Sequence, residues 1–395
     1  MPMMFSMFNL KRSQSLQTMQ EHSTRAIFFV NGFGAASWAP LVPVLRLRLS
    51  ITEDTLGMLL LCIGIGSLLA MPIAGTVASK FGCRKVLTTA GIIFALLLLL
   101  ICNISSLISA VVLLLIFGVV MGCLDVVMNI QAVMVEKAAR RRMMSGMHAM
   151  WSVGGFVGAG LFGIWIGILN LTPFISTLIA AIIMLIILSI FAKYFLPTGG
   201  ESSKSIIAIP RGIVVFFGII TCIAYLVEGA IMDWSGVFLT TAKGFDISLA
   251  GIGFTMFSAA MFTMRLIGDR LIQAIGQKIV VLAGSVIAFI GFVLLIFAEP
   301  QTLLYAGFFL IGIGSANVVP VFFSMIGKQK VMPINMAVPA VSTLGYAGIL
   351  IGPATIGFLA HKTTLFVAFG FLAVLVAFQL FLANYIFKHF EYNEV

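Results

Sequence analysis

The chain is built from long, nearly continuous stretches of apolar residues separated by short polar segments. An α-helix needs about 20 mainly apolar residues to cross the hydrocarbon core of a bilayer, and windows of that length predict twelve membrane-spanning helices. The apolar positions are continuous rather than alternating, which favours helices over the strands of a transmembrane barrel. The predicted spans cover residues 26–46, 54–79, 86–104, 107–134, 145–169, 172–195, 212–241, 247–272, 279–298, 301–327, 337–360 and 364–388. The pattern therefore predicts an all-α membrane protein.

Composition and charge agree with this prediction. Hydrophobic residues make up 61% of the 395 residues and charged residues only 9%, whereas soluble proteins average about 25% charged residues. If the N-terminus is cytoplasmic, only four of the 23 Lys and Arg residues lie in segments outside the cytoplasm: Arg46, Arg48, Lys243 and Lys362. Arg265 is then counted among the bases at the cytoplasmic end of the eighth span. This distribution follows the positive-inside rule, so we expect both termini in the cytoplasm. The net charge of +10 then reflects loops that face anionic lipid and gives no reason to expect nucleic acid as a partner.

The longest interruption of the apolar pattern divides the spans six and six. It covers residues 196–211, which contain several Gly, Pro and charged residues. We predict a cytoplasmic tail at 1–24, a six-helix half at 25–195, a cytoplasmic linker at 196–211, a second six-helix half at 212–388 and a tail at 389–395.

The two halves also resemble each other in sequence. Residues 122–127, Gly-Cys-Leu-Asp-Val-Val, recur at 314–319 as Gly-Ser-Ala-Asn-Val-Val, which pairs Asp125 with Asn317. In the same order, Asn31 of the first span corresponds to Glu228 of the seventh. Parallel repeats of six helices are a transporter architecture, so the sequence favours a transporter.

Two acidic residues lie inside apolar spans, Asp125 in the fourth and Glu228 in the seventh. A carboxylate at membrane depth is costly, and such residues usually line an internal cavity or a proton path. Asn129, one turn beyond Asp125, shares its helix face. Both acids are candidates for proton coupling, and Glu228 is also a candidate for substrate binding. Alternatively, Asp125 hydrogen-bonds a neighbouring helix and locks the bundle, because Gly118 and Gly122 permit close helix packing.

Histidine and tryptophan residues add further candidates. His148 begins the fifth span, where a group that titrates near neutral pH suits proton-dependent gating, although it could equally bond a loop carbonyl. Trp38 and Trp234 occupy repeat-equivalent positions that suit a cavity lining, whereas tryptophan in membrane proteins more commonly lies in interfacial belts. Pro40 and Pro43 are expected to break the first helix at its outer end.

The segment after the second span resembles a family signature. Residues 75–85, Gly-Thr-Val-Ala-Ser-Lys-Phe-Gly-Cys-Arg-Lys, resemble the glycine- and base-rich loop of the major facilitator superfamily, with Ser79-Lys80 where that family has Asp-Arg. In the second half, residues 268–270, Gly-Asp-Arg, occupy the corresponding place. The resemblance implies the major facilitator fold of two parallel six-helix halves. It also implies a cytoplasmic gating loop that contains Gly75, Gly82, Arg84, Lys85, Asp269 and Arg270.

Within the superfamily, four stretches resemble the bacterial YbjJ-type inner-membrane proteins, a group placed near the fucose permeases. These stretches are residues 122–131, 146–152, 228–234 and 345–353. The resemblance implies a multi-pass protein of the bacterial inner membrane. Fucose permeases carry acids in the first and fourth spans, whereas this first span has only Asn31 as its amide-bearing candidate.

We therefore expect a secondary active transporter that moves a small polar solute, for example a sugar, by alternating access coupled to protons. The proton-coupling candidates are Asp125, Glu228 and His148, and the substrate-binding candidates are Asn31, Trp38, Asn129, Gln131, Trp234, Asn317 and Tyr346. No phosphate-binding loop or metal-ligand spacing occurs, so we expect no enzyme activity, no cofactor and no metal. The alternatives are a drug or metabolite efflux antiporter, an uncoupled facilitator and, least favoured, a non-transporting receptor or scaffold. We expect a monomer in the lipid bilayer, with protons and a small-molecule substrate as partners.

Overall fold

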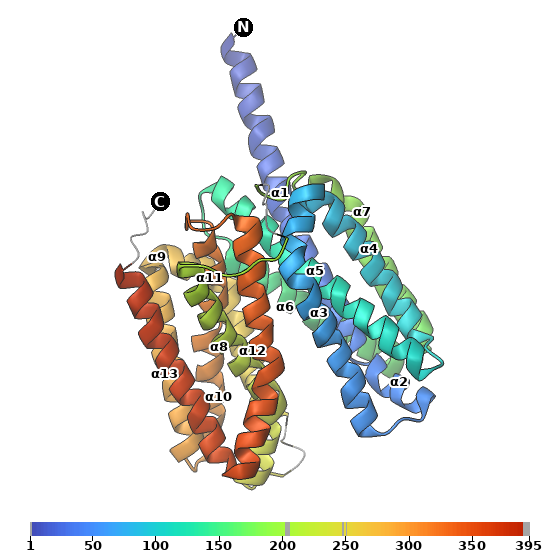
Figure 1. The fold of residues 1–395 in the computed structure, drawn as a ribbon, viewed down its shortest axis with the longest axis vertical. Helices are drawn as coiled ribbons and strands as arrows, with labels where there is room; N and C mark the ends of the chain where they lie inside the picture. Colours follow the sequence, from blue (N-terminus) through green and yellow to red (C-terminus); the bar gives the residue numbers. More distant parts are fainter. Residues whose placement is uncertain (1, 202–205, 247–248, 250, 390–395) are drawn as a thin grey trace. The chain divides into compact units, whose positions relative to one another are not determined.

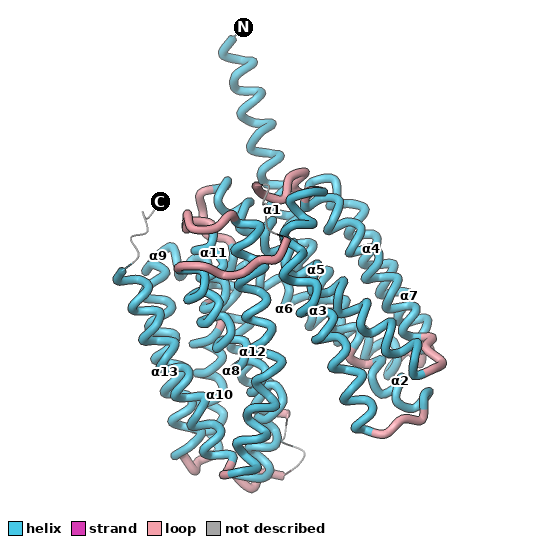
Figure 2. Tube along the Cα trace, in the orientation of Figure 1, coloured by secondary structure: helices cyan, strands magenta, loops and turns pink. Residues whose placement is uncertain are grey.

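The computed structural model describes residues 2–201, 206–246, 249 and 251–389. Helices and loops account for this part of the chain, and it contains no strand (Figure 2). Within it, ten helices are long and apolar enough to cross a membrane. The prediction of an all-α membrane protein is confirmed.

Two differences reconcile these ten helices with the twelve predicted spans. Helix α9 (Ile252–Phe297) is 46 residues long and covers two predicted spans, 247–272 and 279–298. At about 1.5 Å per residue its length far exceeds a bilayer core of about 30 Å, and Gly276, with φ 84° and ψ 155°, divides it into two helices. The first predicted span is divided between α1 (Pro2–Trp38) and α2 (Leu41–Leu49). The break lies beside Pro40, as the sequence predicted.

The chain forms two compact units, and the first comprises Met1–Arg141, Met147–Ile209 and Pro333–Pro339. Besides α1 and α2 it contains α3 (Glu53–Phe81), α4 (Cys83–Cys102), α5 (Leu107–Ala139), most of α6 (Met144–Gly163) with the π-helical turn η1 (Ile164–Ile168), α7 (Pro173–Phe191) and the short η2 (Ala192–Tyr194). Helix α5 packs against α1, α3 and α4 (Figure 1). The approach of α3 to α5 is close, since a Cβ added to Gly118 would lie 2.1 Å from the carbonyl oxygen of Ile63.

Helix α1 extends into the segment that the sequence assigned to an N-terminal tail. It begins at Pro2, and Glu21, Ser23 and Thr24 are buried in the first unit. Glu21 forms an ion pair with Arg141, which follows the end of α5. Residues 21–24 therefore belong to the packed helix rather than to a tail that ends at residue 24.

The second unit comprises Arg142–Gly146, Pro210–Met332 and Ala340–Val395. It contains α8 (Ile213–Val237) with the π-helical η3 (Phe238–Ala242), α9, α10 (Gln301–Ser315), α11 (Val318–Ile326), most of α12 (Ile334–Lys362) and α13 (Leu365–His389). Helix α9 packs against α10 and α13, and α8 packs against α11 and α13. The tenth predicted span, 301–327, is interrupted, because α10 ends at Ser315 and α11 begins at Val318.

Candidate functional site

Asp125 lies in the interior of α5, which the first unit surrounds with α1, α3 and α4. The residue is buried, with 8% of its surface exposed. No ion pair joins it to a base within the described part of the chain. An acid held at this depth without a cationic partner can change its charge by binding a proton.

Two buried amides contact helix α5 close to Asp125 in the sequence. The side-chain amide of Asn129 donates a hydrogen bond to the backbone carbonyl of Asp125 at 2.8 Å, and that of Asn31, on α1, points to the Met128 sulfur at 3.5 Å. Both asparagines are buried, and neither amide oxygen has a hydrogen-bond partner among the described residues. A buried acceptor left unsatisfied costs free energy, and such groups in native proteins call for an explanation. Asn129 thus contacts Asp125 on α5, and Asn31 of α1 contacts the same helix at Met128.

The other candidates of the first unit are held by packing or by structural hydrogen bonds. Gln131 donates to the Thr24 hydroxyl at 3.0 Å and accepts from the Leu196 backbone amide at 3.1 Å. These two bonds tie α5 to α1 and to the linker, so Gln131 is held as a structural residue rather than in the group around Asp125.

His148 and Trp38 both pack against aromatic rings. The His148 ring is buried, and its edge meets Phe28 at a centroid distance of 5.3 Å. Trp38 is buried at the end of α1, 5.9 Å from Phe117. Neither of these ring contacts involves Asp125.

Glu228, on α8, forms an ion pair within the second unit. Its Oε2 lies 3.6 Å from Nη2 of Arg265 on α9. The Arg265 side chain is only 6% exposed, whereas that of Glu228 is 25% exposed. The guanidinium is a permanent charge, so the structure places a buried cation beside the acid that the sequence singled out.

Arg265 also contacts the interruption between α10 and α11. Its Nε donates to the carbonyl oxygen of Ala316 at 3.2 Å, and the adjacent Asn317 donates from Nδ2 to the carbonyl of Met264 at 3.2 Å. The Asn317 amide oxygen is buried without a hydrogen-bond partner within the described part of the chain. A Cβ on Gly268 would lie 2.1 Å from that oxygen, so this position of α9 requires glycine. Backbone groups freed at a broken helix thus meet Arg265 directly.

Arg265 is the residue that sequence reasoning missed. The sequence places it near the end of an apolar span, among the predicted cytoplasmic bases, and the structure shows that it is buried against its neighbours in the second unit. A signal was present, because an apolar window that contains a single base is the pattern expected for an intramembrane charge with a partner.

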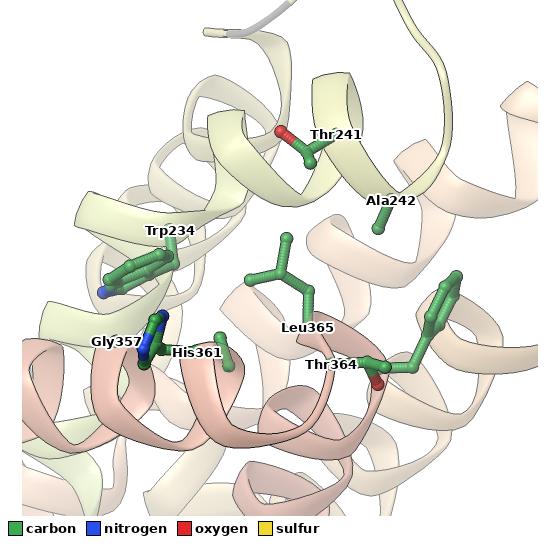
Figure 3. A pocket seen from close by; sticks show the side chains of 9 residues that line it. Trp234, Thr241, Ala242, Gly357, His361, Thr364 and Leu365 are labelled. Atoms are coloured by element: carbon green, nitrogen blue, oxygen red, sulfur yellow. The ribbon is translucent and has the colours of Figure 1, made fainter.

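Trp234 and Tyr346 make other contacts in the second unit. The Trp234 indole donates to the Pro353 carbonyl at 3.0 Å, and Tyr346 packs edge-on against Tyr225 at 6.2 Å. Figure 3 shows a pocket of about 530 Å³ that Trp234 shares with residues from η3, α12 and α13. Neither Glu228 nor Arg265 lines it.

The loop that resembles the family signature is bound to the linker that follows α7. Gly82 has φ 82°, and a Cβ there would lie 2.0 Å from the Pro197 carbonyl oxygen, so both the backbone and the space require glycine. Arg84 donates from Nε to the Phe195 carbonyl at 3.0 Å. Gly75 contacts the Asn335 backbone, where a Cβ would be 1.7 Å from the carbonyl oxygen.

Asp269 caps the start of α6. Its two carboxylate oxygens accept from the backbone amides of Ser145 at 3.0 Å and Gly146 at 2.8 Å. An acid at a helix N-terminus is favourable because it meets free backbone amides and the positive end of the helix dipole. Lys85 and Arg270, the remaining residues predicted for the gating loop, are exposed.

Comparison with known proteins identifies the family. The model of the Major Facilitator Superfamily matches residues 26–217. An MFS-type transporter of Yersinia pestis is 45% identical over 90% of this chain and 93% of its own length. The chain belongs to the major facilitator superfamily. The membrane protein MosC of Rhizobium meliloti is 30% identical over 86% of this chain and 83% of its own length.

Solved structures of this superfamily share the fold. The fucose:proton symporter FucP of E. coli superposes with a TM-score of 0.74 at 16% identity and covers 92% of this chain and 98% of its own. The human organic anion transporter MFSD10 gives a TM-score of 0.74 at 15% identity, with 93% and 99% covered. The chain is thus a multi-pass membrane transporter of the major facilitator superfamily. The resemblance seen in the sequence is confirmed at the level of the superfamily.

Proposed function

We propose that the protein is a secondary active transporter of the bacterial inner membrane that moves a small polar solute by alternating access, coupled to protons. The observation that carries the proposal is that each unit holds a carboxylate in the interior of a membrane-spanning helix, Asp125 of α5 in the first and Glu228 of α8 in the second. A sugar is one candidate solute, and FucP, which is named as a fucose:proton symporter, has this fold.

Asp125 is the proposed proton carrier. Its burial and the absence of an ion pair to a base in the described part of the chain make its charge sensitive to the packing around it. A conformational change that alters access of water to α5 would change the stability of the charged form and so couple proton binding to the change. The amide oxygens of Asn31 and Asn129, which are buried without a hydrogen-bond partner among the described residues, are the proposed contacts for hydroxyl groups of the solute.

The test is flux in proteoliposomes that contain the purified protein and an internal pH dye. Solutes are first selected by thermal shift, and each is then added with and without an imposed pH gradient. We expect uptake by the wild type to acidify the lumen, and Asp125→Asn to retain solute binding but to lose proton movement. Glu136→Gln, which removes another buried acid near the end of the same helix, is the matched control and should keep proton movement.

Two outcomes would contradict the proposal. Uptake that is unchanged when the pH gradient is collapsed would show an uncoupled facilitator. Proton movement by Asp125→Asn and Glu228→Gln at the wild-type rate and pH dependence would show that neither carboxylate carries the proton.

A further inference from the structure

The pocket beside Trp234 lies at the ends of three membrane-spanning segments of the second unit. The segments Ile213–Ala242 and Ile334–Lys362 end at this pocket, and the segment Leu365–His389 begins there. The ends of membrane-spanning helices lie where the hydrocarbon core of a bilayer meets its polar surface, and tryptophan is common at this depth. The pocket is therefore placed where both the chains and the head groups of lipids are within reach.

The walls of the pocket are mainly apolar. The Trp234 indole is fixed by its hydrogen bond to the Pro353 carbonyl, and its ring packs over Gly357, where a Cβ would lie 2.8 Å from a ring carbon. Figure 3 shows the side chain of Leu365 between those of Trp234 and Ala242. The volume of about 530 Å³ lies within the range of about 300–1,000 Å³ that is usual for ligand sites.

Lys243 holds one of these walls in place. Its ammonium group lies 5.0 Å from the centre of the Phe366 ring, which lines the pocket, and donates to the Ala298 carbonyl at 2.8 Å. Its side chain is only 3% exposed, and the Glu299 carboxylate lies 3.8 Å away. Lys243 therefore positions Phe366, and its charge is already opposed by groups of the protein.

The remaining lining of the pocket is polar and basic. His361 lines it together with the hydroxyl-bearing Thr241 and Thr364, and Lys362 follows His361 in the last turn of α12. No acid is among the described residues that line it. In the predicted topology this end of the unit faces away from the cytoplasm, where bases are rare, yet two of the four bases expected there, Lys243 and Lys362, lie in the segments around this pocket. The pocket thus joins apolar walls to basic groups at a membrane surface.

We propose that this pocket binds a phospholipid with an anionic head group. An acyl chain lies against Trp234, Leu365 and Phe366, and the phosphate group is held by His361 and Lys362. Basic residues near a membrane surface attract anionic lipid, and the apolar walls accept the chain that such a lipid carries. A polar solute fits this pocket less well, because its hydroxyl groups would lose water against apolar walls without gaining hydrogen bonds. The proposal depends on neither transport nor proton coupling.

Brominated lipids test this site directly, because bromine on an acyl chain quenches the fluorescence of a tryptophan that the chain contacts. The purified full-length protein in a non-ionic detergent is titrated with phosphatidylglycerol or with phosphatidylcholine that carries the same brominated chains. The difference between the wild type and Trp234→Phe gives the signal of Trp234. We expect saturable quenching, with half-saturation by phosphatidylglycerol at a mole fraction about fivefold lower than by phosphatidylcholine. Equal quenching by the two lipids, or quenching that does not saturate, would show only general contact with lipid and would overturn the proposal.

Two pairs of variants test the apolar and the basic part of the site. Ala360→Leu fills the pocket and should remove the saturable quenching, whereas Ala354→Leu, at an exposed position of the same helix, should not. Lys362→Gln should weaken binding of phosphatidylglycerol about fivefold, whereas Lys330→Gln, which changes an exposed base that does not line the pocket, should have no effect. If Ala360→Leu does not fold, Ala242→Leu takes its place. Saturable binding of phosphatidylglycerol that either pocket variant or Lys362→Gln leaves unchanged would refute the site.

Glycerol 3-phosphate distinguishes a lipid from a soluble phosphate ester. It carries a phosphate group but no acyl chain, so it should not displace brominated phosphatidylglycerol from the wild type even in large excess. Displacement from the wild type, weakened by Lys362→Gln, would show a site for soluble phosphate esters and would overturn the lipid proposal. Because the signal reports binding, these outcomes are independent of the flux measurements that test the transport proposal.

Discussion

Replacing Glu228 by Gln should destabilise the second unit mainly through its effect on Arg265. Gln fills nearly the same volume, so packing is preserved and the change removes the charge that faces the guanidinium. Removing one partner of a buried ion pair leaves an uncompensated charge. Replacing both residues should therefore cost less than the sum of the two single replacements.

The size of this coupling follows from the geometry. At a separation of 3.6 Å and an effective dielectric constant of about 20, two unit charges attract by about 4.6 kcal/mol. Glu228 keeps a quarter of its side chain exposed, and solvent screening there reduces the attraction by roughly half. We expect a coupling free energy of about 2–3 kcal/mol, near the upper end of the range that double-mutant cycles report for residues in contact.

The assay is a double-mutant cycle with Glu228→Gln and Arg265→Gln, in which equilibrium unfolding of each protein is followed in mixed micelles. Lys243 and Glu299 provide a matched control, because they lie 3.8 Å apart and Lys243 is equally buried, but the Glu299 side chain is 89% exposed. Exposed pairs contribute about 0–1 kcal/mol. A coupling for Glu228 and Arg265 no larger than that of the control pair would refute the assignment of Arg265 as a buried charge that depends on Glu228.

Three further changes test other parts of the structure. Gly118→Ala places a Cβ 2.1 Å from the Ile63 carbonyl oxygen and should lower stability by about 1–3 kcal/mol. Its control is Gly160→Ala, which meets open space and should leave the Tm unchanged or raise it. Equal losses of stability in the two variants would contradict the close packing of α3 on α5. Gln131→Ala removes two structural hydrogen bonds and should lower the free energy of unfolding by about 1–3 kcal/mol without changing the KM for the solute. A raised KM with unchanged stability would instead support a binding role for Gln131. Asp269→Asn weakens the cap of α6 and should cost about 0.5–1 kcal/mol, measured as a lower Tm at low salt. An unchanged Tm would show that the negative charge of Asp269 does not strengthen the hydrogen bonds it accepts from the Ser145 and Gly146 backbone amides.

The spans could be predicted from the sequence because membrane crossing depends on a local property, the length of an apolar run. The break at Pro40 could also be predicted, since proline acts on its own helix. The interruption at Asn317 has a local cause as well, which the length of the apolar run does not show. Pro320 has no amide hydrogen for the carbonyl of Ala316, four residues before it, whereas its counterpart in the continuous helix α5 is Met128. Only the structure shows that the freed Ala316 carbonyl is bound by Arg265 on another helix.

The difference between local features and contacts between distant residues also applies to the candidate site. Asp125 and Glu228 stand out in the sequence because a charge inside an apolar run is a local anomaly. The structural role of Gln131 is not visible there, because its partners Thr24 and Leu196 lie far from it in the chain. Arg265 was missed for a related reason: only the packing of α9 against α8 shows that its side chain is buried.

The repeat relation between the halves makes the difference between the two acids informative. Glu228 corresponds to Asn31 and Asp125 to Asn317, so each half supplies one acid and one amide. Arg265 is present only in the second unit, where it contacts the carbonyl beside Asn317 and pairs with Glu228. Asp125 has no ion pair to a base among the described residues, whereas a proton on Glu228 would remove a charge that faces Arg265. On this reasoning Asp125 is the better candidate for the proton carrier, and Glu228 is held by its ion pair. Asp125→Asn should therefore abolish proton movement while solute binding persists, and Glu228→Gln should lower stability more than it changes proton movement.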